Sequence, residues 1–326
     1  MKRFVYAALI ALVPAIVFAQ GRSYGSTVSV TNDPAVNVDG GTVAITNDPA
    51  VNIDGGTLSV TNRPDVNVTN RVIILDSRMA VPAGLMTGQS GVNKFGRSKN
   101  VDAVITDIWD GANSTTDQDI WIAPTAARIH NIASTVAADS NSAAGARTLQ
   151  VYGLTNWANA EVSETITMLG TNVVSTTNAY VILHRMKVLT KGTTNNVGNI
   201  TATAASDDTL TAMILAGEGQ TQMAIYGIPS SQTAYMTCYY SSFNRSGGAA
   251  ALADISLQVN PEPDASLPAF LVKQTQGLQT VGSSLFQHCF NPYFKIVGPA
   301  IVKIQAIGST TDLDISAGFD LVLVDN

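Results

Sequence analysis

Charged side chains are scarce in this sequence, and their scarcity disfavours one class of partner. Asp, Glu, Lys and Arg make up 13% of the residues, about half the usual share. The net charge is −6, and Lys and Arg form no long run. Because phosphate contacts need a positive surface, nucleic-acid binding is disfavoured. Thr, Ser, Asn and Gly are abundant instead, which indicates a β-rich protein with a neutral polar surface rather than a charge-rich disordered chain.

Motifs for catalysis are missing as well. The three histidines, His130, His184 and His288, lie far apart, and neither GxSxG nor HExxH occurs, although a catalytic triad needs a base placed on a nucleophile. The "GEG" at residues 217–219 lacks the strand–loop–helix setting of a phosphate loop. A glycan hydrolase would need a carboxylate pair that no spacing reveals. We therefore predict a non-enzymatic protein with no cofactor.

One acidic stretch is a weak candidate for a metal site. The segment "DIWDGANSTTDQDIW" contains Asp107, Asp110, Asp117 and Asp119, and closely spaced oxygen ligands can bind Ca²⁺. Their spacing does not match an EF-hand loop. A solvated turn between two strands is the alternative, and the spacing favours it.

The sequence has only two cysteines, Cys238 and Cys289. They can form one disulfide, as in a secreted chain, or remain two buried thiols, since the sequence does not give the separation of their Cα atoms. Both lie in apolar stretches, which predicts that both face a core. Without CxxC spacing or paired histidines, they are not expected to bind a metal.

Residues 1–19 form a leader-like segment. Lys2 and Arg3 precede an apolar stretch from Phe4 to Phe18, and Val17 and Ala19 are small, as in a secretory signal peptide cleaved between Ala19 and Gln20. An uncleaved membrane anchor is the alternative, although the stretch is shorter than the ~20 residues of a typical span and Pro14 interrupts it. Both alternatives predict a protein that is exported or membrane-anchored.

A sequence repeat with a period of fifteen residues occurs three times between residues 27 and 70. Each copy has alternating apolar residues on either side of a turn, which contains Pro34, Pro49 or Pro64. Alternation with period two is strand geometry, and proline marks the turn. Asp-Gly-Gly then supplies the positive φ of the return in the first two copies. The apolar residues form one stripe per copy: Val28, Val30, Val36 and Val38; Val43, Ile45, Val51 and Ile53; Leu58, Val60, Val66 and Val68.

These stripes are too narrow to bury themselves, because an isolated two-stranded ribbon is marginal in water. A single-chain β-helix is one solution, but three coils of this length are barely enough for stability. Three identical chains wound around a common axis bury every stripe. We therefore predict that residues 20–75 form the shaft of a homotrimer, with the stripe residues at the trimer axis.

The repeat resembles the triple β-spiral of viral fibre shafts, as in adenovirus and reovirus fibres and some bacteriophage spikes. Pro34, Pro49 and Pro64 match the turn of that repeat, and the valines and isoleucines match its axial stripe. The resemblance covers residues 27–70, and the third copy departs from it with Arg63, Asp65 and no Gly-Gly. It implies an elongated trimer that carries a globular head and is attached to a capsid or membrane through its N-terminus.

Residues 76–100 are rich in Gly, Ser and Asn and predict a linker or hinge. Its charges Lys94, Arg97 and Lys99 indicate a solvated segment rather than a site for an acidic partner. From residue 101 onward, β-branched segments alternate with turn signals, and only residues 123–138 have room for a helical turn. This pattern predicts an all-β head, residues 101–326, with a sandwich or jelly-roll fold. The segment 260–268 is either a long loop or a boundary between two lobes.

The head resembles uncharacterised β-rich proteins encoded by tailed phages, particularly marine ones. The segments that carry this resemblance are "ARTLQVYGLTNWANAEVSETITMLG", "AGEGQTQMAIYGIP", "SSLFQHCFNP" and the final "DISAGFDLVLVDN". The resemblance identifies no active site and implies a virion location.

Aromatic side chains give a binding hypothesis. A platform for a sugar or a protein receptor can be built from Trp109, Trp121, Trp157, Tyr239, Tyr240 and Phe243. Their alternation within strands favours core positions for most of them. Trp157, in the turn "LTNWANAE", is the weak candidate for an exposed receptor-binding residue.

Two functions from different classes follow. The first is a trimeric virion fibre, spike or capsid-decorating protein whose head attaches to a glycan or protein of a host surface. The alternative is an exported bacterial surface protein or carbohydrate-binding adhesin of the same build.

Overall fold

The computed structural model describes residues 77–113, 118–244, 250–266, 269–280 and 283–326. The leader, the predicted shaft with its stripe residues and turn prolines, and Asp117 lie outside the described residues. The described chain is all-β apart from two single-turn helices, α2 (Ser77–Ala80) and η1 (Asp110–Asn113). No helix in these ranges is long and apolar enough to cross a membrane.

Two antiparallel sheets form the larger part of the described chain, here called the body. Sheet I has the order β1 (Gln89–Val101), β16 (Leu313–Asp325), β11 (Gln232–Asn244) and β14 (Ser283–Val297). Sheet II has the order β10 (Ile225–Ile228), β15 (Ala300–Gly308), β12 (Ala251–Asn260) and β13 (Leu271–Thr280). The two-residue strand β2 (Thr106–Asp107) also pairs with β15.

Alternating side chains explain why these two sheets pack face to face. In β16 the apolar residues recur at every second position and are buried: Leu313, Ile315, Ala317, Phe319, Leu321 and Leu323. The buried side chains of β12, from Ala251 to Leu257, follow the same period and belong to the same core. One face of each sheet therefore points into a shared hydrophobic core. The other face of sheet I is left outside, whereas that of sheet II is covered at β10 and β15, where Ile225 and Ile301 belong to a second core.

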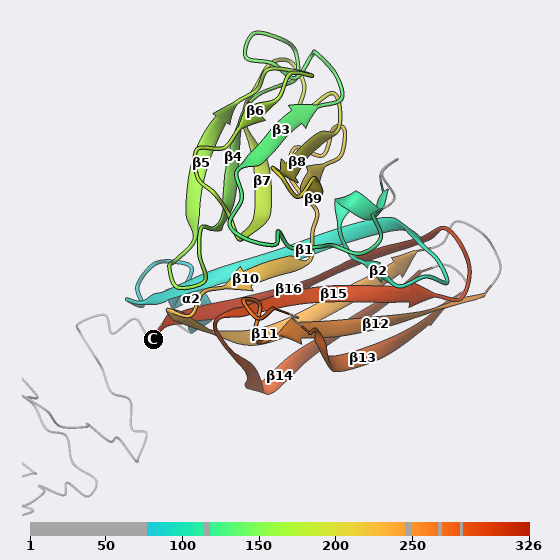
Figure 1. The fold of residues 1–326 in the computed structure, drawn as a ribbon. Coiled ribbons are helices and arrows are strands. Elements are labelled where there is room, and N and C mark those ends of the chain that lie inside the picture. The colour runs from blue at the N-terminus through green and yellow to red at the C-terminus, as the bar shows by residue number, and fades with distance from the viewer. Residues whose placement is uncertain (1–76, 114–117, 245–249, 267–268, 281–282) are drawn as a thin grey trace, which may run out of the picture. The chain divides into compact units, whose positions relative to one another are not determined.

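A second, smaller unit is inserted into the body between β2 and β10; we call residues 118–222 the inserted lobe (Figure 1). One of its sheets has the order β6 (Val174–Ser175), β3 (His130–Ser134), β8 (Ile200–Ala204) and β9 (Thr209–Ile214). The other has the order β5 (Val162–Thr167), β4 (Ala146–Leu154) and β7 (Ile182–Lys191). The lobe has its own hydrophobic core.

The insertion leaves the body intact because both flanking strands pair with β15. Asp107 of β2 is opposite Gln305, and Ile225 of β10 is opposite Lys303. The chain therefore leaves and re-enters sheet II along the same edge. The division of the head lies at this insertion, whereas the predicted boundary segment 260–268 connects β12 to β13, two neighbouring strands of sheet II.

The predicted linker 76–100 is wrong for most of its length. From Gln89 it is strand β1, paired with β16 from Gln89↔Val324 to Val101↔Leu313. Glycine made this segment resemble a linker, but Gly96 has a packing role. A Cβ at Gly96 would overlap the backbones of Ile108 and Ala224, so only glycine lets β1 lie this close to the rest of the body.

The chain enters and leaves the body at one end, which we call the entry end. Gln89 pairs with Val324, and the Asp325 amide donates to the Gly88 oxygen at 2.9 Å. Other strand assignments also differ from what the sequence indicates, and residues 119–123, which also read as a strand, form none. Residues 123–138 contain β3 instead of a helical turn, and β14 was not predicted as a strand.

Candidate interaction surface

The face of sheet I that points away from the core is the most distinctive surface of the described residues. Strand register places side chains of four strands in rows across it. One row runs through Phe95, Gly318, Tyr240 and Gln287. We call this surface the outer face of sheet I. It comprises Gly91, Asn93, Phe95, Arg97, Asp314, Ser316, Gly318, Asp320, Val322, Val324, Tyr235, Cys238, Tyr240, Ser242, Leu285, Gln287, Cys289, Lys295 and Val297.

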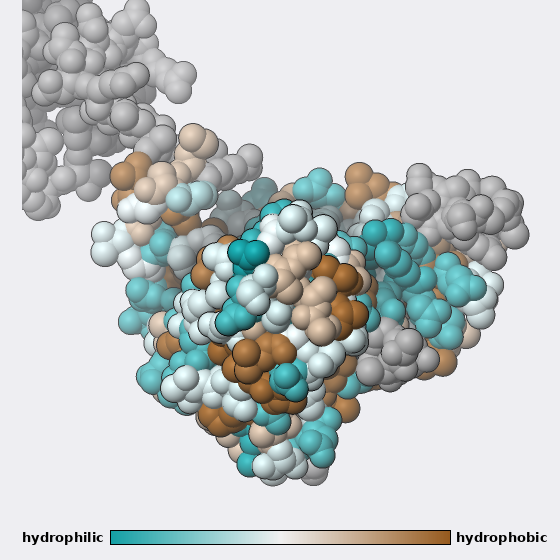
Figure 2. All heavy atoms as spheres, turned by 90° about the horizontal axis from the view of Figure 1, so that it is seen from above, coloured by the Kyte–Doolittle hydropathy of each residue, from teal (hydrophilic) through white to brown (hydrophobic). Residues whose placement is uncertain are grey.

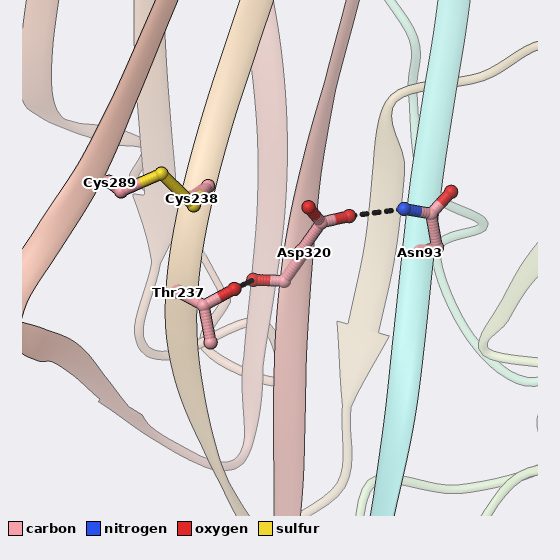
Figure 3. Close-up of a disulfide and its surroundings, with 5 residues drawn as sticks. All are labelled: Asn93, Thr237, Cys238, Cys289 and Asp320. Atoms are coloured by element: carbon pink, nitrogen blue, oxygen red, sulfur yellow. Dashed lines mark hydrogen bonds between the residues drawn. A yellow bond between two sulfur atoms is a disulfide. The ribbon is translucent and has the colours of Figure 1, made fainter. Parts of the chain in front are cut away.

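A disulfide lies in the next row of this face (Figure 3). Cys238 of β11 is bonded to Cys289 of β14, directly across the two strands. In the same row Asn93 of β1 donates from Nδ2 to Asp320 of β16, and Thr237 Oγ1 donates to the Asp320 backbone oxygen at 3.3 Å. Side-chain and covalent bonds therefore reinforce the row across all four strands of sheet I.

The disulfide faces outward, contrary to the expectation that both cysteines face a core. Cys238 is half-buried and Cys289 is exposed. The reason is a register shift between Met236 and Cys238. Met236 points into the core, and the extra residue Thr237 reverses the alternation, so that Cys238 points out.

Removing this disulfide is expected to lower the free energy of unfolding by about 4 kcal/mol, because the bond closes a loop across a sequence separation of 51 residues. The variant is Cys238→Ala with Cys289→Ala, measured by urea unfolding followed with far-ultraviolet circular dichroism. Reducing the wild-type protein should produce the same loss. Free thiols in the native, unreduced protein would contradict the assignment.

Apolar and aromatic side chains are unusually frequent on this outward surface. Phe95 is 37% exposed, Val297 56% and Leu285 75%, while Tyr235 and Tyr240 are half-buried. A Cβ at Gly318 would lie 2.5 Å from Tyr240 Oη. Glycine at this position therefore lets the tyrosine ring lie flat across β16.

Charges on the same face are mostly paired. Arg97 Nε donates to Asp314 Oδ1 at 2.8 Å, and this hydrogen bond raises the pKa of Arg97. Burial raises the pKa of Asp320, which accepts the hydrogen bond from Asn93. A face that exposes aromatic and apolar side chains, with most of its charges paired, has features of the core of a protein interface, where aromatic residues are enriched and charged residues are depleted.

The tip of the inserted lobe is a second surface, formed by loops 135–145, 168–173 and 192–199. Buried Asp139 ties these loops together. Its Oδ1 accepts from the Ala146 and Val197 amides at 2.9 and 2.8 Å, its Oδ2 accepts from Ser134 Oγ and the Gly198 amide at 2.6 and 2.9 Å, and its backbone oxygen accepts from the Gly170 amide at 2.7 Å. Figure 2 looks down on this lobe and shows apolar side chains among neutral polar ones. The exposed apolar side chains of the tip are Leu169, Val173 and Val197.

A buried polar cluster joins the inserted lobe to the body. Lys94 Nζ of β1 donates to the backbone oxygen of His184 on β7 at 2.6 Å. The His184 ring lies against Tyr226 of β10, with 4.4 Å between ring centroids, and its Nε2 contacts Glu161 Oε2 at 2.5 Å. Groups from β1, β7, β10 and the start of β5 therefore meet at one point.

Burial sets the charges of this cluster. Burial, with repulsion from Arg185, lowers the pKa of Lys94 to about 7, and burial also lowers the pKa of His184. Burial alone would raise the pKa of Glu161, but attraction to His184, Lys94 and Arg185 leaves that pKa below its ordinary value. Near neutral pH, His184 is therefore neutral and donates from Nε2 to an ionised Glu161.

Three of the acidic residues proposed as weak metal ligands, Asp107, Asp110 and Asp119, lie in the described chain, and they do not form a metal site there. Asp107 is buried and accepts from Lys303 Nζ at 2.8 Å, Gln305 Nε2 at 3.0 Å and the Trp121 amide at 2.9 Å. Asp110 is buried elsewhere, where burial raises its pKa to about 8. The backbone oxygen of Asp119 accepts from the Asp107 amide at 2.8 Å. In the described part of the chain, no group of three or more His, Cys, Asp and Glu is arranged to hold a metal ion.

The aromatic candidates divide between the cores and the surface. Those with buried rings are Trp109, Trp121, Tyr239 and Phe243. Trp157, the candidate receptor residue, is half-buried and packs against the core of the inserted lobe. Tyr240 lies on the outer face of sheet I. Its neighbours there come from strands distant in sequence, so only the register identifies this surface.

Comparisons with known proteins give no family. No protein-family model matches the sequence, and no curated protein matches it. The infectious bursal disease virus Gt strain structure aligns at 9% identity over 73% of this chain and 73% of that chain, with a TM-score of 0.20. The T=1 particle derived from infectious bursal virus aligns at 11% identity over 73% and 70% of the two chains, with a TM-score of 0.17. Alignments with TM-scores this low carry no argument about fold or function.

Proposed function

We propose that the protein is a non-enzymatic, trimeric fibre or spike protein of a virion, which presents its all-β head to a host surface. The observation that carries this proposal is the position of the entry end. The repeat segment must join the head at α2 and β1, and β1 begins beside the C-terminal strand β16. The opposite end of the body is then free of the connection, whereas the Trp157 turn of the inserted lobe lies at the entry end, where the Ser230 amide donates to the Trp157 oxygen at 2.7 Å.

The repeats supply the reason for a trimer. Each chain has an alternating apolar stripe that it cannot bury by itself. Packing three chains around a shared axis would bury the stripes of all three. Three heads on one shaft also allow each contact with a host to be weak, because linked sites bind together. The tip of the inserted lobe suits this role, since Asp139 fixes its loops and leaves apolar side chains on its surface.

The trimer is tested by light scattering on residues 20–326. We expect about three times the mass of one chain. Replacing the stripe residues Val36 and Val51 by Asp should give a monomer, because six charges would then be placed at the axis. The matched control, Asn37→Asp with Asn52→Asp, adds the same charge to the other side of the strands and should remain trimeric.

A monomeric wild-type protein would remove the basis for a fibre, and a trimeric stripe variant would remove the role of the stripes. The virion assignment is tested separately, by probing purified particles with an antibody against the head. If the protein is absent from the particles and present on a bacterial surface, the adhesin is favoured instead.

A further inference from the structure

The chain reaches the body along the outer face of sheet I. Gly91 belongs to this face, and Val81 of the turn after α2 lies 4.0 Å from the position that a Cβ of Gly91 would take. Val81 is buried, whereas Met79 and Leu85 beside it are 63% and 62% exposed. The entry segment therefore continues the apolar surface of the outer face at the entry end.

We propose that the outer faces of sheet I pack against one another around the trimer axis, so that the occupant of this surface is a second copy of the same chain. The inference rests on the proposed trimer. Three chains that share a shaft enter their heads close to its axis. The face along which each chain enters is then the face nearest the two other heads.

The size of the surface fits this role. Sheet I is four strands wide, and β1 is 13 residues long. At about 4.8 Å between strands and about 3.3 Å per residue, the face covers roughly 800 Å². Divided between the two neighbours, it gives roughly 400 Å² per partner at each contact, so these contacts would add to those of the shared shaft rather than hold the heads together alone.

Charge on the two halves of the face is complementary. Three-fold contacts are heterologous, so the half formed by β1 and β16 in one copy meets the half formed by β11 and β14 in the next. The first half carries Asp320, and the second carries Lys295. Arg97 and Asp314, which belong to the first half, already neutralise each other.

The outer face of sheet II provides control positions for a measurement of side-chain accessibility on sheet I. Ser256 of β12 is a half-buried serine on that face, just as Ser242 of β11 is on the face of sheet I. The edge strands give a second matched pair, the exposed glutamines Gln287 of β14 and Gln279 of β13. The two native cysteines are bonded to each other, so an introduced cysteine is the only free thiol.

The test measures the reaction of a maleimide–polyethylene glycol reagent with four variants of residues 20–326: Ser242→Cys, Ser256→Cys, Gln287→Cys and Gln279→Cys. In the trimer we expect Ser242→Cys and Gln287→Cys to react at least about tenfold more slowly than their controls on sheet II. In the monomer produced by Val36→Asp with Val51→Asp, the protection should disappear. The glutamine pair keeps the test decisive if a serine variant does not fold, because both glutamines are exposed.

The outcomes separate this inference from the proposed function. A trimer in which the sheet I thiols react as fast as the sheet II thiols overturns the inference and leaves the trimer intact. A monomeric wild-type protein overturns both.

Discussion

Replacing Asp139 with asparagine is expected to lower the free energy of unfolding of the inserted lobe by about 5 kcal/mol. The buried carboxylate accepts four hydrogen bonds, three from backbone amides and one from Ser134. Each hydrogen bond to a charged group contributes about 1.5–3 kcal/mol. An asparagine amide nitrogen is a donor and would face Ser134 Oγ or amide groups that also donate. At least one buried amide would then lose its partner.

Tryptophan fluorescence during urea unfolding measures this loss. Trp109 and Trp121 belong to the core of the inserted lobe, and Trp157 packs against it. The signal therefore reports on this lobe. Asp208→Asn is the matched control, since Asp208 is exposed and its φ of 52° is a conformation that asparagine tolerates. The control should change the free energy of unfolding by less than about 0.5 kcal/mol, and a similarly small effect at Asp139 would contradict its role as the tie between the tip loops.

The sequence was sufficient to predict most strands of the head, because their alternation is strong. In β16 every second residue from Leu313 to Leu323 is apolar and buried, as the period-two pattern indicates. β1 was missed because its glycines and charged residues are typical of a linker. Two of those residues act through contacts that the sequence does not show: Gly96 allows a close backbone approach, and the Lys94 ammonium is buried against His184.

The insertion of one lobe into the body and the outer face of sheet I could not be predicted from the sequence. Both depend on pairings between segments far apart in the chain. The insertion is defined by β2 and β10 sharing the edge of β15. The outer face of sheet I combines four strands, and the bulge at Thr237 reverses the direction in which Cys238 points. Local patterns fix which residues alternate but not which strands become neighbours.

The stability of the protein is expected to rise between pH 7 and pH 10 because of Lys94, and the Lys94→Met variant should lack this rise. The pKa of Lys94 falls from 10.5 to about 7 in the folded protein, chiefly through burial and then through the nearby Arg185. Between these two values the unfolded chain binds one more proton than the folded chain, so the free energy of unfolding increases with pH. Below about pH 7 both states are protonated, and the cost of burying the ammonium is fully present.

Across pH 7 to 10 the advantage of Lys94→Met over wild type should therefore decrease by about 4 kcal/mol, at about 1.4 kcal/mol for each unit of pH. The other groups of the cluster do not produce this slope. Burial lowers the pKa of His184, Glu161 is ionised, and burial raises the pKa of Tyr226, so these groups keep their charge in the folded protein throughout this range. Urea unfolding at four pH values measures the difference, with Lys273→Met as the control because Lys273 is exposed on β13. A difference between Lys94→Met and wild type that stays constant from pH 7 to 10 would mean that the Lys94 ammonium reaches water, and that the inserted lobe does not seal this side of β1.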